Sequence, residues 1–92
     1  MAEPLSKTEI AAGYDQIADK LAMSPKFYRL CRRLLAPQLM PNSVLLDVGC
    51  GQGRLLADFR ASLPQAKLHG LDISPKLIEI AQQNVPGGHF TT

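Results

Sequence analysis

The residues whose types and spacing most clearly indicate a chemical role lie in the stretch VLLDVGCGQGR, which covers residues 44–54. In this stretch Asp47 is followed by Gly49, Gly51 and Gly53, so one acid precedes three glycines at alternate positions. A glycine-rich loop between a strand and a helix lets the backbone approach a nucleotide-like ligand closely. The pattern therefore predicts a ligand-binding loop, and its spacing decides which ligand fits.

The spacing disfavours two common phosphate-binding loops. A Walker-type loop needs a lysine and a hydroxyl residue after its last glycine, whereas Arg54 and Leu55 follow here. The dinucleotide fingerprint G-x-G-x-x-G fails because Gly53 comes one position too early. A pyrophosphate at the helix N-terminus would also be repelled by Asp47. A ligand with a cationic group fits better beside Asp47. S-adenosylmethionine carries both an ammonium and a sulfonium group. Its carboxylate would accept hydrogen bonds from loop amides.

A second acid, Asp72, ends a predicted strand 25 residues after Asp47. A carboxylate at this place can accept hydrogen bonds from both hydroxyls of a ribose, and Ile73 beside it would pack on a purine. Ribose recognition alone also fits NAD, so an NAD-dependent oxidoreductase remains an alternative, although the two acids and the alternate glycines together favour S-adenosylmethionine. Cys50 lies between two of the glycines, where we expect an accessible small residue beside the ligand and no nucleophile, because no base lies nearby.

Alternating strand and helix patterns position these residues. The apolar run at 44–48 is typical of a buried parallel strand. In chain order we then expect a helix over 54–63, a strand over 67–73, a helix over 75–84 capped by Ser74, and the start of a strand at 89–92. This order predicts an α/β fold with a Rossmann-like, doubly wound parallel sheet, of which about the first three strands are present. In such sheets ligands bind beyond the carboxyl ends of the strands, where the glycine loop lies.

Two amphipathic helices precede the sheet. The first is predicted over 5–22 and begins with the capping-box spacing of Ser6 and Glu9, while the second is predicted over 24–37 with Ser24 as its cap. We treat residues 1–40 as a helical cap and 41–92 as the N-terminal half of a ligand-binding domain. The second helix also carries four basic residues: Lys26, Arg29, Arg32 and Arg33. We interpret them as a solvated face of the helix, and the alternative is that they attract an acidic substrate or an anionic surface.

Two segments together resemble a known family. LLDVGCGQGRLL and LHGLDISPKLIEIAQQN look like motifs I and II of the class I S-adenosylmethionine-dependent methyltransferases, over residues 44 to about 84. The YDQIA segment of the first helix is similar to the N-terminal cap of small-molecule methyltransferases of the ubiquinone and menaquinone biosynthesis type. The resemblance implies that the acid of motif I lies near the methionine amino group, that the acid of motif II binds the ribose, and that Tyr14 closes over the ligand. The implied cofactor-binding residues are Asp47, Gly49, Cys50, Gly51, Gly53, Asp72, Ile73 and Tyr14.

The resemblance implies a methyltransferase that transfers the methyl group of S-adenosylmethionine to a small-molecule acceptor. Such a transfer depends mainly on holding the acceptor in line with the methyl group. Domains of this family typically have seven strands and this chain reaches the third, so we expect it to correspond to the N-terminal portion, and no catalytic residue is assigned. A truncated, non-catalytic cofactor-binding or interaction module is the alternative, and an open edge of the first strand would favour pairing into a homo-oligomer.

Composition narrows the classes of partner. The chain has 92 residues, 46% of them hydrophobic, and its net charge of +2 is too weak to indicate nucleic acid or a membrane surface. Three Phe and two Tyr form no visible platform for stacked bases. Cys31 and Cys50 fit no metal-ligand spacing, so we expect reduced thiols and no metal. We find no signal-peptide pattern and no run long enough to insert stably in a membrane, and we therefore expect a cytoplasmic protein.

Overall fold

The computed structural model describes residues 4–19 and 25–92 as four α-helices, one 3-10 turn and a three-stranded sheet. The elements, in chain order, are α1 (Lys7–Ile17), α2 (Pro25–Leu35), η1 (Ala36–Gln38), β1 (Val44–Val48), α3 (Arg54–Ser62), β2 (Lys67–Leu71), α4 (Pro75–Asn84) and β3 (His89–Thr91). The predicted alternation of strands and helices after residue 42 is confirmed. The expected cap at Ser24 lies outside the described residues.

Local signals in the sequence explain how the helices begin and end. At α1, the Ser6 hydroxyl accepts a hydrogen bond from the Glu9 amide at 3.1 Å, and the Glu9 carboxylate accepts one from the Ser6 amide at 3.2 Å. At α4, the Ser74 hydroxyl accepts from the Leu77 amide at 3.1 Å. Helix α1 ends at Ile17, earlier than predicted, and the carbonyl of the next residue, Ala18, accepts a hydrogen bond from the Gln52 side chain.

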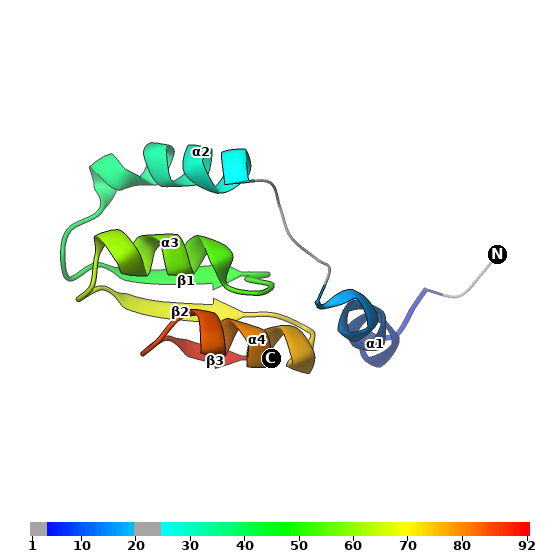
Figure 1. The fold of residues 1–92 in the computed structure, drawn as a ribbon. Helices are drawn as coiled ribbons and strands as arrows, with labels where there is room; N and C mark the ends of the chain where they lie inside the picture. Colours follow the sequence, from blue (N-terminus) through cyan, green and yellow to red (C-terminus); the bar gives the residue numbers. More distant parts are fainter. Residues whose placement is uncertain (1–3, 20–24) are drawn as a thin grey trace.

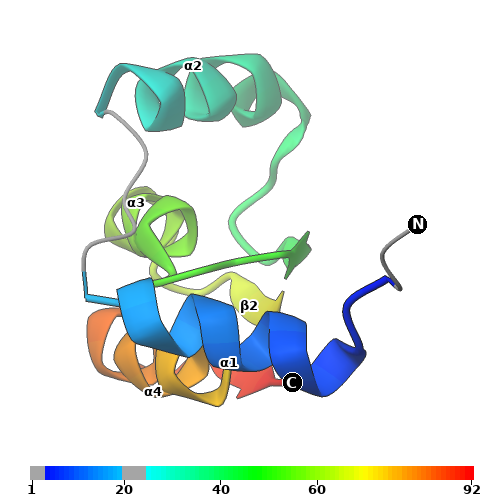
Figure 2. The ribbon, with the colours of Figure 1, turned by 90° about the vertical axis from the view of Figure 1, so that its right-hand side faces the viewer.

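All three strands are parallel and lie in the order β1-β2-β3. This order is one winding direction of a doubly wound sheet, and the crossover helices α3 and α4 cover the same face of the sheet (Figure 1). The core lies between that face and the two helices, with five fully buried residues at its centre: Leu56, Phe59, Ala66, Leu68 and Val85. Helix α2 lies on the outer side of α3, and α1 lies beyond the carboxyl ends of the strands (Figures 1 and 2).

The opposite face of the sheet is uncovered along β1. Val44, Leu46 and Val48 are 65%, 60% and 74% exposed, whereas the intervening residues of the strand point toward the helices and are half-buried. The prediction of a strand buried on both faces is therefore wrong for this chain. The reason is that both crossover helices lie on one side, and β1 pairs only with β2 among the described residues.

Candidate functional site

The glycine loop follows β1 at the edge of the sheet where the parallel strands end. Gly49, Gly51 and Gly53 all have positive φ values, of 78°, 55° and 76°. Residues with a side chain rarely adopt this left-handed conformation, so the alternate glycines are what allow the chain to turn from β1 into α3. The amides of Gly49 and Cys50 both donate to the carbonyl of Leu71, at 2.7 and 2.9 Å, and thereby fasten the loop to the end of β2.

The three glycines have different surroundings. A Cβ atom at Gly49 or Gly51 would have no atom within 4 Å, so these two positions border open space. A Cβ at Gly53 would lie 3.0 Å from the Cβ of Ala81 and 3.2 Å from Cγ2 of Val85, both on or next to α4. The first two glycines thus leave room for a ligand, whereas the third lets α3 and α4 pack closely.

Asp72 links the loop to the segment that enters α4. One of its carboxylate oxygens accepts a hydrogen bond from the Gly51 amide at 2.9 Å, and the other accepts one from the Ser74 amide at 3.0 Å. Each carboxylate oxygen can accept a further hydrogen bond, so these contacts leave capacity for ligand hydroxyls. Asp72 therefore shapes the site and also presents acceptors to it.

The loop amides are largely used within the protein. Besides Gly49 and Cys50, the amide of Gly51 donates to Asp72 and that of Gly53 donates to the carbonyl of Cys50 at 2.9 Å. The expectation that these amides would receive the ligand carboxylate does not hold for these four groups. The amides of Gly49, Cys50, Gly51 and Gly53 are thus not free to bind an anionic ligand group.

Asp47 is half-buried and faces the same space. Burial, and after it the nearby negative charge of Asp72, raise the pKa of the Asp47 carboxyl above its usual range. Within the described residues no hydrogen-bond donor or cationic side chain compensates this charge. A ligand ammonium group beside Asp47 would supply the compensating charge, so the site suits a cation at this point.

The expectation that Cys50 is accessible is wrong. Its thiol is buried, with 8% of the residue exposed, because its sulfur packs over Gly70, where a Cβ would lie 2.8 Å from Sγ. Burial, together with the charges of Asp72 and Asp47, raises the pKa of the thiol to about 12. Cys50 therefore stays protonated at neutral pH and contributes volume rather than a nucleophile. Both Cys50 and Cys31 are free.

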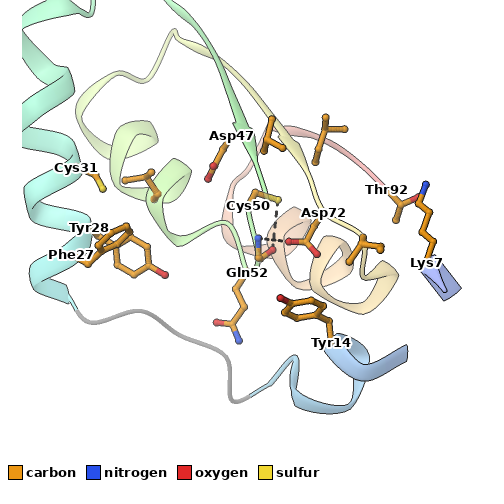
Figure 3. Close-up of a pocket in the computed structure, with 16 residues that line it drawn as sticks. Lys7, Tyr14, Phe27, Tyr28, Cys31, Asp47, Cys50, Gln52, Asp72 and Thr92 are labelled. Atoms are coloured by element: carbon orange, nitrogen blue, oxygen red, sulfur yellow. Dashed lines mark hydrogen bonds between the residues drawn. The ribbon is translucent and has the colours of Figure 1, made fainter. Parts of the chain in front are cut away.

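These residues line a cleft of about 810 Å³ (Figure 3). Seven of the predicted cofactor-binding residues border it, and Gly53, the packing glycine, does not: Tyr14, Asp47, Gly49, Cys50, Gly51, Asp72 and Ile73. Figure 3 shows two ends of the cleft, with Tyr14 near Asp72 at one end and Phe27, Tyr28 and Cys31 of α2 at the other. Cofactor-sized ligands occupy pockets of about 300–1,000 Å³, so the volume is adequate.

Two features of the cleft were not predicted from the sequence: the buried Gln52, and the part of the cleft lining that α2 contributes. Gln52 is only 6% exposed, its side-chain amide donates to the Ala18 carbonyl, and its oxygen accepts from Arg54 Nε at 3.0 Å. A glutamine between two glycines carries no signal of burial, because its partner in α1 is 34 positions away. Phe27 and Tyr28 were recognisable as helix residues, but their direction depends on how α2 packs beside α3.

Residues 46–91 match the protein family described as "Methyltransferase domain". The chain belongs to this methyltransferase family. The family description is general and does not distinguish the ubiquinone and menaquinone type. No helix in residues 4–19 or 25–92 has the length and apolar character needed to cross a membrane.

Individual relatives agree with this assignment. The chain is 42% identical over 41 residues to malonyl-[acyl-carrier protein] O-methyltransferase of Halalkalibacterium halodurans, covering 45% of this chain and 15% of the relative. It is 41% identical over 70 residues to a probable fatty acid methyltransferase of Pseudomonas putida, covering 76% of this chain and 17% of the relative. The chain thus spans less than a fifth of the length of these two proteins.

A solved structure identifies the cofactor. The plantazolicin methyltransferase BpumL, in complex with a pentazolic desmethylPZN analog and S-adenosylhomocysteine, superposes with a TM-score of 0.61 at 29% identity. The match covers 91% of this chain and 33% of BpumL. The fold is that of a partial class I methyltransferase, and the cofactor of the family is S-adenosylmethionine.

Proposed function

We propose that this chain is the cofactor-binding part of an S-adenosylmethionine-dependent methyltransferase that acts on a small-molecule acceptor. The observation that carries the proposal is the pair Asp47 and Asp72 on one cleft, separated by two glycines that border open space. Asp47 would compensate the ammonium group, Asp72 would accept hydrogen bonds from the ribose, and Ile73 would pack on the adenine. The regions 1–40 and 41–92 would act as helical cap and as cofactor-binding half.

The acceptor would lie at the α2 end of the cleft. Phe27 and Tyr28 pack edge to face, with ring centroids 5.9 Å apart, and Cys31 and Leu55 continue this wall. An apolar wall of this kind suits an acceptor with an aliphatic or aromatic body. The names of two relatives support the same class, since one acts on malonyl-[acyl-carrier protein] and another is a probable fatty acid methyltransferase.

The chain's own contribution to the transfer would be positional. The cleft brings the cofactor and acceptor ends together, and an in-line arrangement of the two reactants supplies much of the rate in such reactions. None of the cleft residues is assigned as a general base. The open edge of β1, which pairs only with β2 among the described residues, would in addition pair with a second copy, because unpaired strand edges favour such contacts.

Calorimetric titration with S-adenosylhomocysteine tests the proposal. The wild-type chain should show saturable binding that excess NAD does not displace. Asp72→Ala should lose that binding, while Glu79→Ala, which removes an exposed acid of α4 away from the cleft, should retain it. Circular dichroism of each variant controls for folding, since Asp72 also bonds to two backbone amides. Absence of binding by a folded wild-type chain contradicts the proposal.

A further inference from the structure

Helix α1 is attached to the rest of the molecule in an unusual way. It contributes no buried residue between Lys7 and Ile17, and its apolar residues Ile10, Tyr14 and Ile17 remain 37%, 41% and 45% exposed. Most amphipathic helices are held by a buried apolar face. Apart from Ala18, which follows the helix and is fully buried, hydrophobic packing therefore explains little of the position of α1.

Polar contacts of a few residues fix α1 instead. The Asp15 carboxylate accepts hydrogen bonds from the Ser74 hydroxyl and from the Lys76 amide, the latter at 3.2 Å. At the end of the helix, the Gln52 side chain donates to the carbonyl of Ala18. All of these partners belong to the two segments that border the cleft, namely the glycine loop and the entry to α4.

Asp15 is the strongest of these contacts on physical grounds. Its carboxylate lies at the N-terminus of α4, where free amides and the helix dipole favour a negative charge. It also engages Ser74, which is fully buried and is itself the cap of α4. By contrast, the ion pair between Asp19 and Lys76, 3.1 Å long, is exposed to 72% and 48% at its two side chains and contributes little.

The neighbour of Asp15 in the sequence is Tyr14, whose ring borders the cleft near Asp72 (Figure 3). We propose that Asp15 is a positioning residue for the cofactor site, which docks α1 on the entry to α4 and thereby holds Tyr14 over the ligand. This inference rests on the proposed function, because it assumes that the cleft receives the cofactor. Asp15 itself does not border the cleft, so it acts through the placement of α1.

A double-mutant cycle with S-adenosylhomocysteine tests the inference. Asp15→Ala should weaken binding about tenfold, the scale of one lost hydrogen bond to a charged group. Asp15→Asn should restore part of the affinity, because its amide oxygen still accepts from Ser74 and Lys76 although the negative charge at the N-terminus of α4 is lost. Asp19→Ala, two residues beyond the end of α1, is the matched control, and its affinity should stay within about twofold of wild type. In the Tyr14→Ala background, Asp15→Ala should cause little further loss, because its effect passes through Tyr14.

Two further measurements keep the outcomes distinct. Hydrogen exchange of the α1 amides should be faster in Asp15→Ala than in wild type and should slow in wild type on addition of S-adenosylhomocysteine. Thermal unfolding of Asp15→Ala should change by only a few degrees, because residues Lys7–Ile17 contribute no buried side chain to the core. If wild type and Asp15→Ala bind equally well, the positioning role of Asp15 is overturned and the proposed function stands. The same holds if the losses of binding free energy in Tyr14→Ala and Asp15→Ala are additive in the double variant. If wild type does not bind, the proposed function and this role both fail.

Discussion

Replacing Gly53 by alanine should destabilise the fold more than replacing Gly49, although both residues have nearly the same backbone conformation. Their φ values of 76° and 78° impose similar left-handed strain, about 1–2 kcal/mol for a residue with a Cβ. The two variants differ in what the new Cβ meets. At Gly53 it comes within 3.0–3.2 Å of Ala81 and Val85, which are 0% and 1% exposed, whereas at Gly49 it meets nothing within 4 Å.

The difference between the variants therefore isolates a packing cost. Forcing a methyl group into a packed interior costs about 1–3 kcal/mol. For a domain of this size, each kcal/mol lowers Tm by about 4–8 °C, so Gly53→Ala should unfold at least about 4 °C below Gly49→Ala. The reverse order is expected for ligand binding, because the methyl group of Gly49→Ala projects into the cleft while folded Gly53→Ala keeps the cleft free.

Thermal unfolding followed by circular dichroism and calorimetry with S-adenosylhomocysteine measure the two effects on the same samples. Gly13→Ala is a suitable control, since it lies within α1 and a Cβ there meets nothing within 4 Å. Equal Tm values for Gly49→Ala and Gly53→Ala would refute the conclusion that Gly53 serves helix packing and Gly49 leaves room for the ligand. So would a loss of affinity in Gly53→Ala alone.

Three other perturbations follow from the site and the sheet. The folded state raises the pKa of Asp47 above its ordinary 3.8, so the unliganded protein should lose stability as pH rises from 3.8 through the raised pKa. Near neutral pH, Asp47→Asn should therefore unfold at a higher temperature than wild type. Thermal scans at several pH values measure both effects. The same variant should bind S-adenosylhomocysteine more weakly, and wild-type affinity should fall as pH drops through the raised pKa. In a Cys31→Ser background, Cys50 should react with iodoacetamide only slowly at neutral pH and rapidly in urea, as mass spectrometry would reveal, because its thiol is buried with a pKa of about 12. Leu46→Lys, on the uncovered face of β1, should reduce any self-association seen by sedimentation of wild type, and a wild type that is monomeric at every concentration would contradict pairing through β1.

Local sequence signals were sufficient to predict the order of elements. Ser74 followed by Pro75 marks the start of α4, and the apolar run around Asp47 marks β1, because these signals act over a few residues. The cluster at the cleft was also predictable, since the carboxyl ends of parallel strands meet at one edge of the sheet and bring Asp47 and Asp72 together.

Properties that depend on distant neighbours were not predictable in this way. The burial of Cys50 depends on the absence of a side chain at Gly70, and the burial of Gln52 depends on the carbonyl of Ala18. The exposure of β1 depends on which elements lie across the sheet from it, which an apolar run does not specify. In each case the deciding partner lies far away along the chain.

The two hydrogen bonds from the glycine loop to the Leu71 carbonyl have a consequence for the thermodynamics of ligand capture. They hold the loop in its final shape through contacts internal to the protein, so the loss of conformational freedom takes place during folding. A ligand that enters the cleft then meets a preorganised rim, and its affinity is not reduced by ordering that segment. Any entropy penalty and slow step in association should instead arise from α1, whose residues Lys7–Ile17 contribute no buried side chain and which is held by a few polar contacts.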